Sequence, residues 1–412
     1  MRAVPKFIAF YLPQFYPFPE NDDWWGKGFT EWTNVTKARP QLAGHYQPHL
    51  PTDLGFYDLR VRETRHEQIK MAKSYGIDGF CYHYYWFSGK RLMDLPLDDM
   101  LQDRDSDMPF CINWANEGWT RRWDGKERDV LIAQKYLPDD DLRLMDDVCR
   151  YFADPRYITI DDAPLFIVYR PQQLPNYRKS IEFWRRRAAE NGFSDLHLCC
   201  ALTHGNTSLL EGFDSGVEFP PHNLNGVHQF SVQPVNSDFF GSIFEHGDIA
   251  ANYLARDYGR APVFRTVFPS WDNTARLGNR ALIIVNSTPR NYEYWLGQVA
   301  ARSAGRMPFV FINAWNEWAE GCHLEPDRHN GRAFLEATKR VREGTSAVAG
   351  FESLPGSQSW FHRSKVGRET NRIVRQVSRV PAKLGGSKIA REANRIVRQV
   401  RQLRTSFRAR EG

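Results

Sequence analysis

The sequence lacks any apolar run long enough to cross a membrane as a helix. Near the N-terminus, Arg2 and Lys6 lead into the apolar run Phe7–Leu12, which Pro13 ends. This run is too short to supply both the apolar core and the cleavage site of a signal peptide. We therefore predict that it forms the first strand of the fold rather than a secretion signal.

Cysteine is scarce, with six residues among 412, and no Cys-x-x-Cys pair occurs. Cys81, Cys111, Cys199 and Cys200 lie inside apolar runs that are typical of strands. Buried, reduced thiols of this kind favour a reducing compartment over an oxidising one. The composition thus predicts a cytoplasmic protein, and a peripheral position on the inner face of the membrane is a candidate arrangement.

Motifs for phosphates, metals and other cofactors are also missing. The segment Pro13–Pro17 has no glycine where a dinucleotide-binding fold carries its glycine-rich loop. The sequence contains neither His-Glu-x-x-His nor Cys and His at zinc-binding spacings, so no metal and no cofactor are expected. Asp139–Asp141 fits the Asp-x-Asp pattern of many nucleotide-sugar transferases. It follows Pro138 and opens a helix-like segment, which favours helix capping instead.

Charge is unevenly distributed along the chain. Residues 361–412 contain 15 Lys or Arg and 3 Glu, a net charge of +12 within an overall charge of +6. Residues 1–360 contain the remaining 40 basic and 46 acidic residues, a net charge of −6. The basicity therefore belongs to the C-terminal segment and carries no information about the substrate.

The C-terminal segment has its own organisation. Residues 351–366 include a stretch rich in Ser, Gly and Pro, which predicts a linker after a domain of residues 1–350. Residues 367–412 contain an internal repeat, Arg368–Val377 and Arg391–Val400. Each copy predicts a short basic amphipathic helix, which favours docking on an anionic membrane surface; packing on the main domain or assembly are the alternatives. Without interleaved aromatic residues for base stacking, nucleic acid is not expected as a partner.

Eight short apolar runs recur along the first 350 residues, each followed by polar or aromatic side chains. They are Phe7–Tyr11, Gly79–Tyr85, Phe110–Trp114, Leu165–Tyr169, Leu196–Leu202, Gly216–Phe219, Pro262–Phe268 and Phe309–Ile312. Segments with helical periodicity lie between most of them, at Val61–Tyr75, Leu142–Phe152, Ser180–Asn191 and Tyr292–Ser303. This alternation predicts parallel β/α units and, with eight of them, an α/β fold of the (β/α)8 TIM-type barrel class with a C-terminal basic helical tail. A doubly wound sheet is the alternative, which the missing glycine-rich loop disfavours.

The last run leads into Asn313–Gly321, where Glu317 and Glu320 stand three residues apart among tryptophans and asparagines. In such a barrel the active site lies at the C-terminal ends of the strands. Carboxylates move protons and indole rings stack on the C–H faces of sugars, so the segment predicts sugar chemistry. A strand end with a surface glutamate and two core tryptophans is the alternative. The spacing puts both acids on one side if the chain turns helical, and on opposite faces if it stays extended.

The ends of other strands and the long loop after the first strand supply candidates for substrate binding. The third run closes on Asn-Glu, as the eighth does, which makes Glu117 a substitute partner for Glu317 should the segment stay extended. The candidate substrate-binding residues are Tyr11, Gln14, Glu31, Trp32, His83, Tyr85, Trp86, Asn113, Glu117, Trp119, His204, Trp271, Trp315, Asn316 and Trp318.

Asn316–Pro326 reads Asn-Glu-Trp-Ala-Glu-Gly-Cys-His-Leu-Glu-Pro and resembles the signature of glycoside hydrolase family 99-like proteins. The resemblance implies a (β/α)8 barrel and retaining chemistry, in which Glu317 acts as a base on the sugar 2-hydroxyl and Glu320 as the general acid/base. Ala319 stands where those hydrolases carry His, which leaves the sugar specificity open. Residues 5–340 are similar to the WbsX-type branch of this group, through Phe10–Phe15, Gly28–Asn34, Gly76–Phe80, His83–Trp86 and Asn113–Glu117.

The leading hypothesis is therefore an enzyme that cleaves or remodels glycosidic bonds by retaining acid/base chemistry. The resemblance implies an oligosaccharide or polysaccharide substrate in a bacterial surface-polysaccharide or lipopolysaccharide O-antigen pathway, with a lipid-linked oligosaccharide as one candidate. A glycosyltransferase of the same pathway is the first alternative. A non-catalytic carbohydrate-binding barrel is the second.

Overall fold

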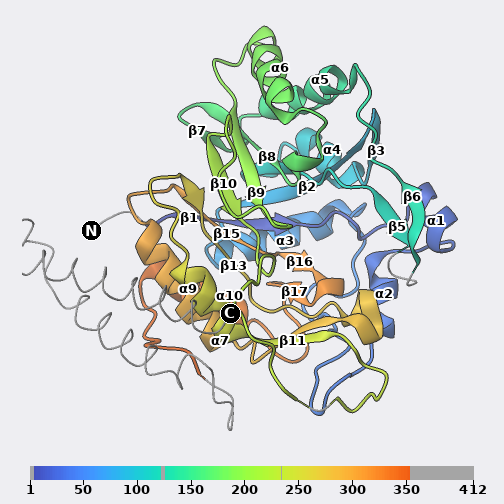
Figure 1. Cartoon of the computed structure of the whole chain (residues 1–412), viewed down its shortest axis with the longest axis vertical. Helices are drawn as coiled ribbons and strands as arrows, with labels where there is room; N and C mark the ends of the chain where they lie inside the picture. Colours follow the sequence, from blue (N-terminus) through green and yellow to red (C-terminus); the bar gives the residue numbers. More distant parts are fainter. Residues whose placement is uncertain (1–3, 122–125, 233, 353–412) are drawn as a thin grey trace, which may run out of the picture. The chain divides into compact units, whose positions relative to one another are not determined.

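The structure is a computed structural model that describes residues 4–121, 126–232 and 234–352. The chain divides into two units, residues 1–352 and 353–412. All elements described below belong to the first unit (Figure 1).

Predictions for the C-terminal segment fall almost wholly outside the described residues. Only the first two residues of the predicted linker 351–366 are described, and the predicted basic helices of residues 367–412 are not. Among the helices of the described ranges, none combines the length and the hydropathy that crossing a bilayer requires.

A sheet of parallel strands forms the centre of the first unit. Along the sheet the order is β12, β10, β9, β8, β4, β2, β1, β15, β13. The bounds are β1 Lys6–Tyr11, β2 Gly79–Phe87, β4 Phe110–Trp114, β8 Ala163–Val168, β9 His197–Leu202, β10 Ser215–Glu218, β12 Val263–Phe264, β13 Thr266–Val267 and β15 Phe309–Ile312.

The two ends of this order meet in one stretch of chain, because only Arg265 separates β12 from β13. Val263 pairs with Gly216 of β10, and Thr266 pairs with Phe311 of β15. The stretch therefore joins both edges of the sheet and closes it into a barrel. Counted as one strand, it brings the parallel strands of this central sheet, within the described residues, to eight, and the predicted barrel is confirmed.

Burial on both faces explains why the strands could be recognised as continuous apolar runs. Every residue of β4 and of β8 is buried. Helices pack outside the sheet and bury one stripe each; α5 does so with Leu144, Met145 and Val148. The main helices are α3 Arg62–Ser74, α4 Leu95–Gln102, α5 Asp140–Phe152, α6 Tyr177–Glu190, α7 His246–Ala255, α9 Pro289–Ser303 and α10 Ala333–Glu343.

The Asp139–Asp141 triplet opens α5, as its sequence context predicts. Asp139 occupies the N-cap position, but its side chain makes no capping hydrogen bond. Asp140 accepts a hydrogen bond from the Trp86 indole, and Asp141 accepts one from the indole of Trp184 on α6. The triplet thus ties the start of α5 to its neighbours. All six cysteines are free and buried, which confirms the predicted core positions of Cys81, Cys111, Cys199 and Cys200.

Several loops contain short helices and strands of their own. The loop after β1 holds α1 Pro19–Trp25 and α2 Glu31–Lys37, and the loop after β13 holds α8 Thr274–Leu277. A small antiparallel pair, β16 Asn316–Glu317 and β17 Cys322–His323, follows β15. The others are β3 Lys90–Leu92, β5 Trp119–Arg121, β6 Lys126–Ile132, β7 Thr159–Ile160, β11 Ser242–Glu245 and β14 Leu282–Val285.

Candidate active site

The segment after β15 brings Glu317 and Glu320 to one side of the chain. Glu317 ends β16, and residues Trp318–Glu320 form a single 3-10 turn, in which positions three apart eclipse one another. The chain thus turns helical at the point where the spacing of the two acids requires it. Gly321 follows with φ +56°, and a Cβ there would meet Asp272 O at 2.9 Å, so glycine is needed to end the turn.

Both carboxylates contact the guanidinium of Arg276, a residue of α8. Arg276 Nη2 donates to Glu317 Oε2 at 3.1 Å, and Nη1 lies 2.7 Å from Glu320 Oε1. The Nε of the same arginine donates to Glu31 Oε1 of α2 at 2.9 Å. Three carboxylates from two loops of the barrel therefore meet at one cation, which a third loop supplies.

This arrangement leaves more negative than positive charge at the site. Glu317 is 6% exposed, and burial raises the pKa of its carboxyl to about 8. Arg276 opposes this rise in pKa, while the charges of Glu320 and Glu31 add to it. Because one guanidinium balances only one of the three carboxylates, the group retains a proton near neutral pH.

His83 lies on the other side of Glu317. Its Nε2 is 3.7 Å from Glu317 Oε1, and its Nδ1 is 3.2 Å from the side-chain nitrogen of Asn113. Burial and the nearby Arg276 lower the pKa of His83 to about 4, so its imidazole is neutral. Because the Asn113 amide donates to Nδ1, the ring proton sits on Nε2 and faces Glu317.

Partly exposed aromatic and charged residues lie around this group. The Tyr85 ring packs edge-on against Trp119 with centroids 5.1 Å apart. Burial raises the pKa of the Tyr85 phenol, and the charges of Glu317 and Glu117 raise it further. Glu117 pairs with Arg170 at 3.0 Å. The predicted residues Tyr85, Glu117 and Trp119 thus come together near Glu317.

A second aromatic group stands at the ends of β8, β9 and β10. The Tyr169 hydroxyl lies 3.1 Å from His222 Nε2, and its ring packs edge-on against His204 with centroids 5.6 Å apart. Burial raises the pKa of the Tyr169 phenol, with further contributions from Glu117 and Glu320. The predicted His204 is exposed and has neighbours, Tyr169 and His222, that were not among the predicted candidates.

Several predicted sugar contacts belong instead to the core. Trp318 is 2% exposed; its indole donates to Glu325 Oε2 at 2.6 Å and stacks on His323 at 3.7 Å. Trp315 is fully buried with its ring 5.4 Å from that of Phe80. These two tryptophans therefore support the segment that carries the acids from behind, as core residues.

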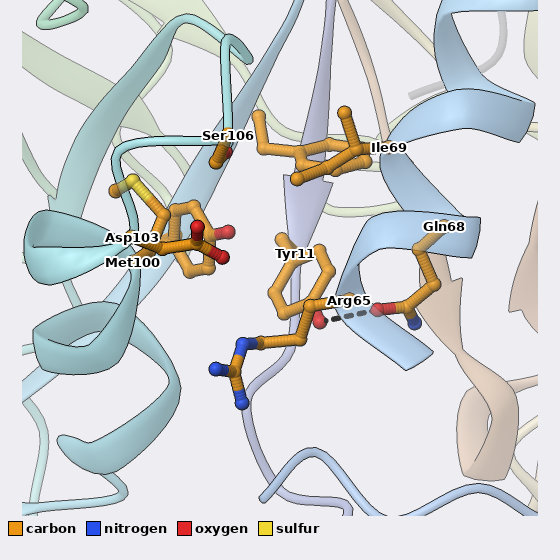
Figure 2. Close-up of a pocket in the computed structure, with 9 residues that line it drawn as sticks. Tyr11, Arg65, Gln68, Ile69, Met100, Asp103 and Ser106 are labelled. Carbon is orange, nitrogen blue, oxygen red and sulfur yellow. Dashed lines mark hydrogen bonds between the residues drawn. The ribbon is translucent and has the colours of Figure 1, made fainter. Parts of the chain in front are cut away.

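Tyr11 and Trp86 point away from the two acids. The Tyr11 hydroxyl donates to Gln68 Oε1 of α3 at 2.8 Å, beside a small cavity that Arg65 and Asp103 also line (Figure 2). The Trp86 indole faces Asp140 on α5. Since side chains alternate along a strand, Trp86 lies on the face opposite Tyr85.

The remaining candidates lie in segments that follow β1, β13 and β15. Asn316 clamps β16 to the end of β1, because its side chain accepts from Leu12 N at 2.8 Å and donates to Leu12 O at 3.0 Å. The Trp32 indole donates to Tyr57 O, and Gln14 O accepts the backbone N–H of Glu31. Trp271 is buried, and its backbone carbonyl accepts from Ile284 N.

Arg276, at the centre of this group of carboxylates, was not among the residues that the sequence predicted. It lies 41 positions before Glu317 in a loop without a recognisable motif. Only a general rule could have pointed to it: buried carboxylates need a nearby cation, and in a barrel the loops after the strands can supply one.

Comparisons with known proteins agree with this architecture. Residues 7–338 match the sequence model of the family described as Glycosyltransferase WbsX. The protein WxcX of Xanthomonas campestris pv. campestris strain B100 is 44% identical over 351 residues, which cover 83% of this chain and 50% of WxcX; WxcX of strain ATCC 33913 matches equally. The chain thus spans half the length of these relatives.

A solved structure shares the fold at low sequence identity, and a second one is similar over most of the chain. A glycoside hydrolase-like protein superposes with a TM-score of 0.51 and 13% identity over 82% of this chain and 94% of its own. A GH99 endo-alpha-mannosidase from Bacteroides thetaiotaomicron has a TM-score of 0.48 and 15% identity, over 82% of this chain and 97% of its own. The family match spans residues 7–338, which include Glu317, Glu320 and Arg276, and the chain belongs to the family described as Glycosyltransferase WbsX.

Proposed function

We propose that this protein cleaves or remakes glycosidic bonds with retention of configuration, using Glu317 and Glu320 as its acid/base pair. Its substrate is a bacterial surface polysaccharide, a lipopolysaccharide O-antigen or a lipid-linked precursor of either. The observation that carries the proposal is the contact of both carboxylates with Arg276, at 3.1 and 2.7 Å. Two acids held by one cation can act on one sugar ring.

The first step breaks the glycosidic bond. Glu317 takes the proton of the sugar 2-hydroxyl while O2 attacks C1 and the bond from C1 to the leaving oxygen breaks. Glu320 gives its proton to that leaving oxygen. The products are a 1,2-anhydro sugar and a free hydroxyl on the departing saccharide. These roles follow the resemblance of Asn316–Pro326 to family 99-like hydrolases.

The second step opens the anhydro ring. Glu320, now ionised, takes a proton from water, whose oxygen attacks C1 as the C1–O2 bond breaks. Glu317 returns its proton to O2, so both carboxyls regain their starting states. Two inversions at C1 give net retention.

The mechanism needs one protonated and one ionised carboxyl. A singly protonated pair satisfies it, and the pKa of Glu317, raised to about 8, supports one retained proton at neutral pH. The two acids share Arg276 and titrate as a unit, so that proton belongs to the pair rather than to one residue. The neutral His83 directs its Nε2 proton toward Glu317, which stabilises the ionised form of that carboxyl when it acts as a base.

The partly exposed aromatic groups give the saccharide its contacts. Tyr85 with Trp119 and Tyr169 with His204 present ring faces and edges, which pack on the apolar C–H surfaces of sugars. The Glu117–Arg170 pair offers charged hydrogen-bonding groups for hydroxyls.

Transfer to a sugar acceptor is a second candidate, which the description of the family as a glycosyltransferase favours. An acceptor hydroxyl would replace water in the second step, with the same residues in the same roles. A nucleotide-sugar donor would differ, because its diphosphate leaves without needing a proton from Glu320.

The test incubates the full chain with α-linked mannans, with lipid-linked glycans and with nucleotide sugars. Release of reducing ends supports hydrolysis, a lengthened saccharide supports transfer, and consumption of nucleotide sugar supports a nucleotide-dependent transferase. Glu320→Gln should lower turnover of glycosides at least about a hundredfold. Glu211→Gln, a change at an exposed glutamate paired with Arg178, is the matched control and should be neutral. Saccharide binding without turnover of any of these substrates would reject the proposal.

A fluoride leaving group separates the two roles, since fluoride departs without general acid assistance. On a matching glycosyl fluoride, Glu320→Gln should keep its first step and Glu317→Gln should lose it. The reverse pattern would exchange the roles of the two acids.

A further inference from the structure

Three metal-ligating side chains converge behind the segment that carries the acids. His49, His323 and Asp327 each direct one donor atom to a common point, with all three atoms within 4.8 Å of one another. His49 Nδ1 lies 3.0 Å from His323 Nε2, which is 3.9 Å from Asp327 Oδ2. All three residues are buried, with 7%, 2% and 2% of their surface exposed.

Neighbouring groups orient these donors. His323 Nδ1 donates to the backbone carbonyl of Glu325 at 2.9 Å, so its Nε2 lone pair faces the other two residues. Asp327 Oδ1 accepts the backbone N–H of His329 at 2.9 Å, and Oδ2 accepts the side-chain amide of Asn330 at 3.2 Å. A histidine ligand whose second nitrogen donates to a carbonyl is the usual supporting arrangement at metal sites.

The donor set of this cluster is mixed. Unlike a surface cluster of acids, this group pairs two nitrogen donors with a single oxygen donor.

We infer that His49, His323 and Asp327 bind one divalent transition-metal ion, with Zn²⁺ the best match to two imidazoles and one carboxylate. Ligands at about 2.0–2.1 Å from a tetrahedral ion stand roughly 3.3 Å apart, between the 3.0 and 3.9 Å separations in this cluster. A small inward movement of Asp327 completes three protein ligands, and water fills the remaining position.

This metal site was not predicted from the sequence, because only metal-binding motifs with short spacings between ligands can be recognised there. His49 lies in the loop after β1 and His323 in β17, 274 positions later, so no short motif joins them. The inference goes beyond the proposed function, since neither Glu317 nor Glu320 is a ligand.

An ion here would fasten the loop after β1 to the segment that carries the acids. His323 pairs with Asn316, and Cys322 pairs with Glu317, in the β16–β17 ladder. Trp318 stacks on the His323 ring at 3.7 Å. The ion therefore acts as a positioning group that makes no contact with the sugar.

The test uses the full chain without a histidine tag, dialysed against a chelator and then titrated with Zn²⁺ alone. Calorimetry should give one ion per chain, and the melting temperature should rise with the Zn²⁺ concentration. Co²⁺ in place of Zn²⁺ should give the visible absorption of a four-coordinate nitrogen and oxygen site. His49→Gln, His323→Gln and Asp327→Asn should each weaken binding by at least about tenfold.

His228→Gln changes an exposed histidine outside the cluster and should leave binding intact. Circular dichroism shows whether each variant is folded; if one is not, the Co²⁺ spectrum of the wild-type chain still decides. Absence of saturable binding, or binding that all three ligand variants keep, overturns the inference and leaves a plain N–H···N hydrogen bond between His49 and His323. These readouts do not involve activity, so they are independent of whether the proposed function fails.

Discussion

Arg276 Nε lies 2.9 Å from Glu31 Oε1, so a fully buried carboxylate of α2 anchors the cation between the two candidate acids. Glu31 is itself held by the side-chain amide of Asn34, one turn later in α2, which donates to its Oε2 at 3.2 Å. The loop after β1 therefore sets where the guanidinium stands, and the guanidinium sets how Glu317 and Glu320 face one another.

Glu31→Gln should lower kcat/KM roughly ten- to hundredfold, since hydrogen bonds to charged groups contribute about 1.5–3 kcal/mol. The same change removes a negative charge that raises the pKa of Glu317. The alkaline limb of the rate profile should therefore move to lower pH. A substitution that only loosened the fold would lower the rate and leave the limb where it was, and Glu211→Gln should change neither.

The rate should depend on pH through the proton that the acid pair retains. The pKa of Glu317 is raised to about 8 by burial, so the singly protonated pair loses its proton as pH rises through that value. We expect kcat/KM, which reports the free enzyme, to fall above about pH 8. A plot of log kcat/KM against pH checks this. A flat profile between pH 7 and 10 would show that the reaction does not depend on a proton shared by the two acids.

Stability should follow the same proton. Between 4.5, the ordinary pKa of Glu317, and about 8, its pKa in the folded protein, the folded state binds more protons than the unfolded state. The contribution of Glu317 to stability is therefore complete at low pH and is lost as pH rises through about 8. Glu317→Gln removes this loss, so the variant should gain in melting temperature over the wild type as pH rises from 5 to 9. A constant difference across that range would show that the carboxyl is not perturbed.

Two tryptophans should respond differently to substitution because one is core and one is partly exposed. Trp318→Phe removes the indole that donates to Glu325 and should lower the free energy of unfolding by about 1–3 kcal/mol. Trp119→Ala should raise KM several-fold, because its ring packs against Tyr85 near the acids. Melting curves and saturation kinetics on both variants separate the effects. An unchanged KM for Trp119→Ala would take that ring out of the binding surface.

The fold could be predicted from the sequence because parallel strands of a closed barrel are buried on both faces. Such strands appear as continuous apolar runs, and even the short β10, Ser215–Glu218, was recognisable. Glu317 and Glu320 were recognisable for a different reason, since a three-residue spacing at a strand end has few geometric outcomes.

The residues that surround Glu317 and Glu320 could not be predicted, because the sequence does not show whether a side chain at a strand end points into the site or into the core. Trp315 and Trp318 are aromatic residues of the kind that stack on sugars, yet both are buried in the core. Arg276 and the pair of His49 with His323 come from loops distant in sequence, and their meeting depends on how the barrel closes. Short sequence motifs cannot reveal contacts between residues that lie far apart in the chain.

The basic C-terminal segment gives a prediction that rests on charge alone. Residues 361–412 carry a net charge of +12, against −6 for the rest, and each basic residue near an anionic surface contributes about 1 kcal/mol. Removal of residues 361–412 should abolish binding to vesicles that contain anionic lipid and leave turnover of soluble glycans unchanged. Vesicle co-sedimentation at low and high salt measures the first effect, and high salt should weaken binding of the full chain by screening. If the shortened chain still sediments with anionic vesicles, the surface that binds them lies in the barrel.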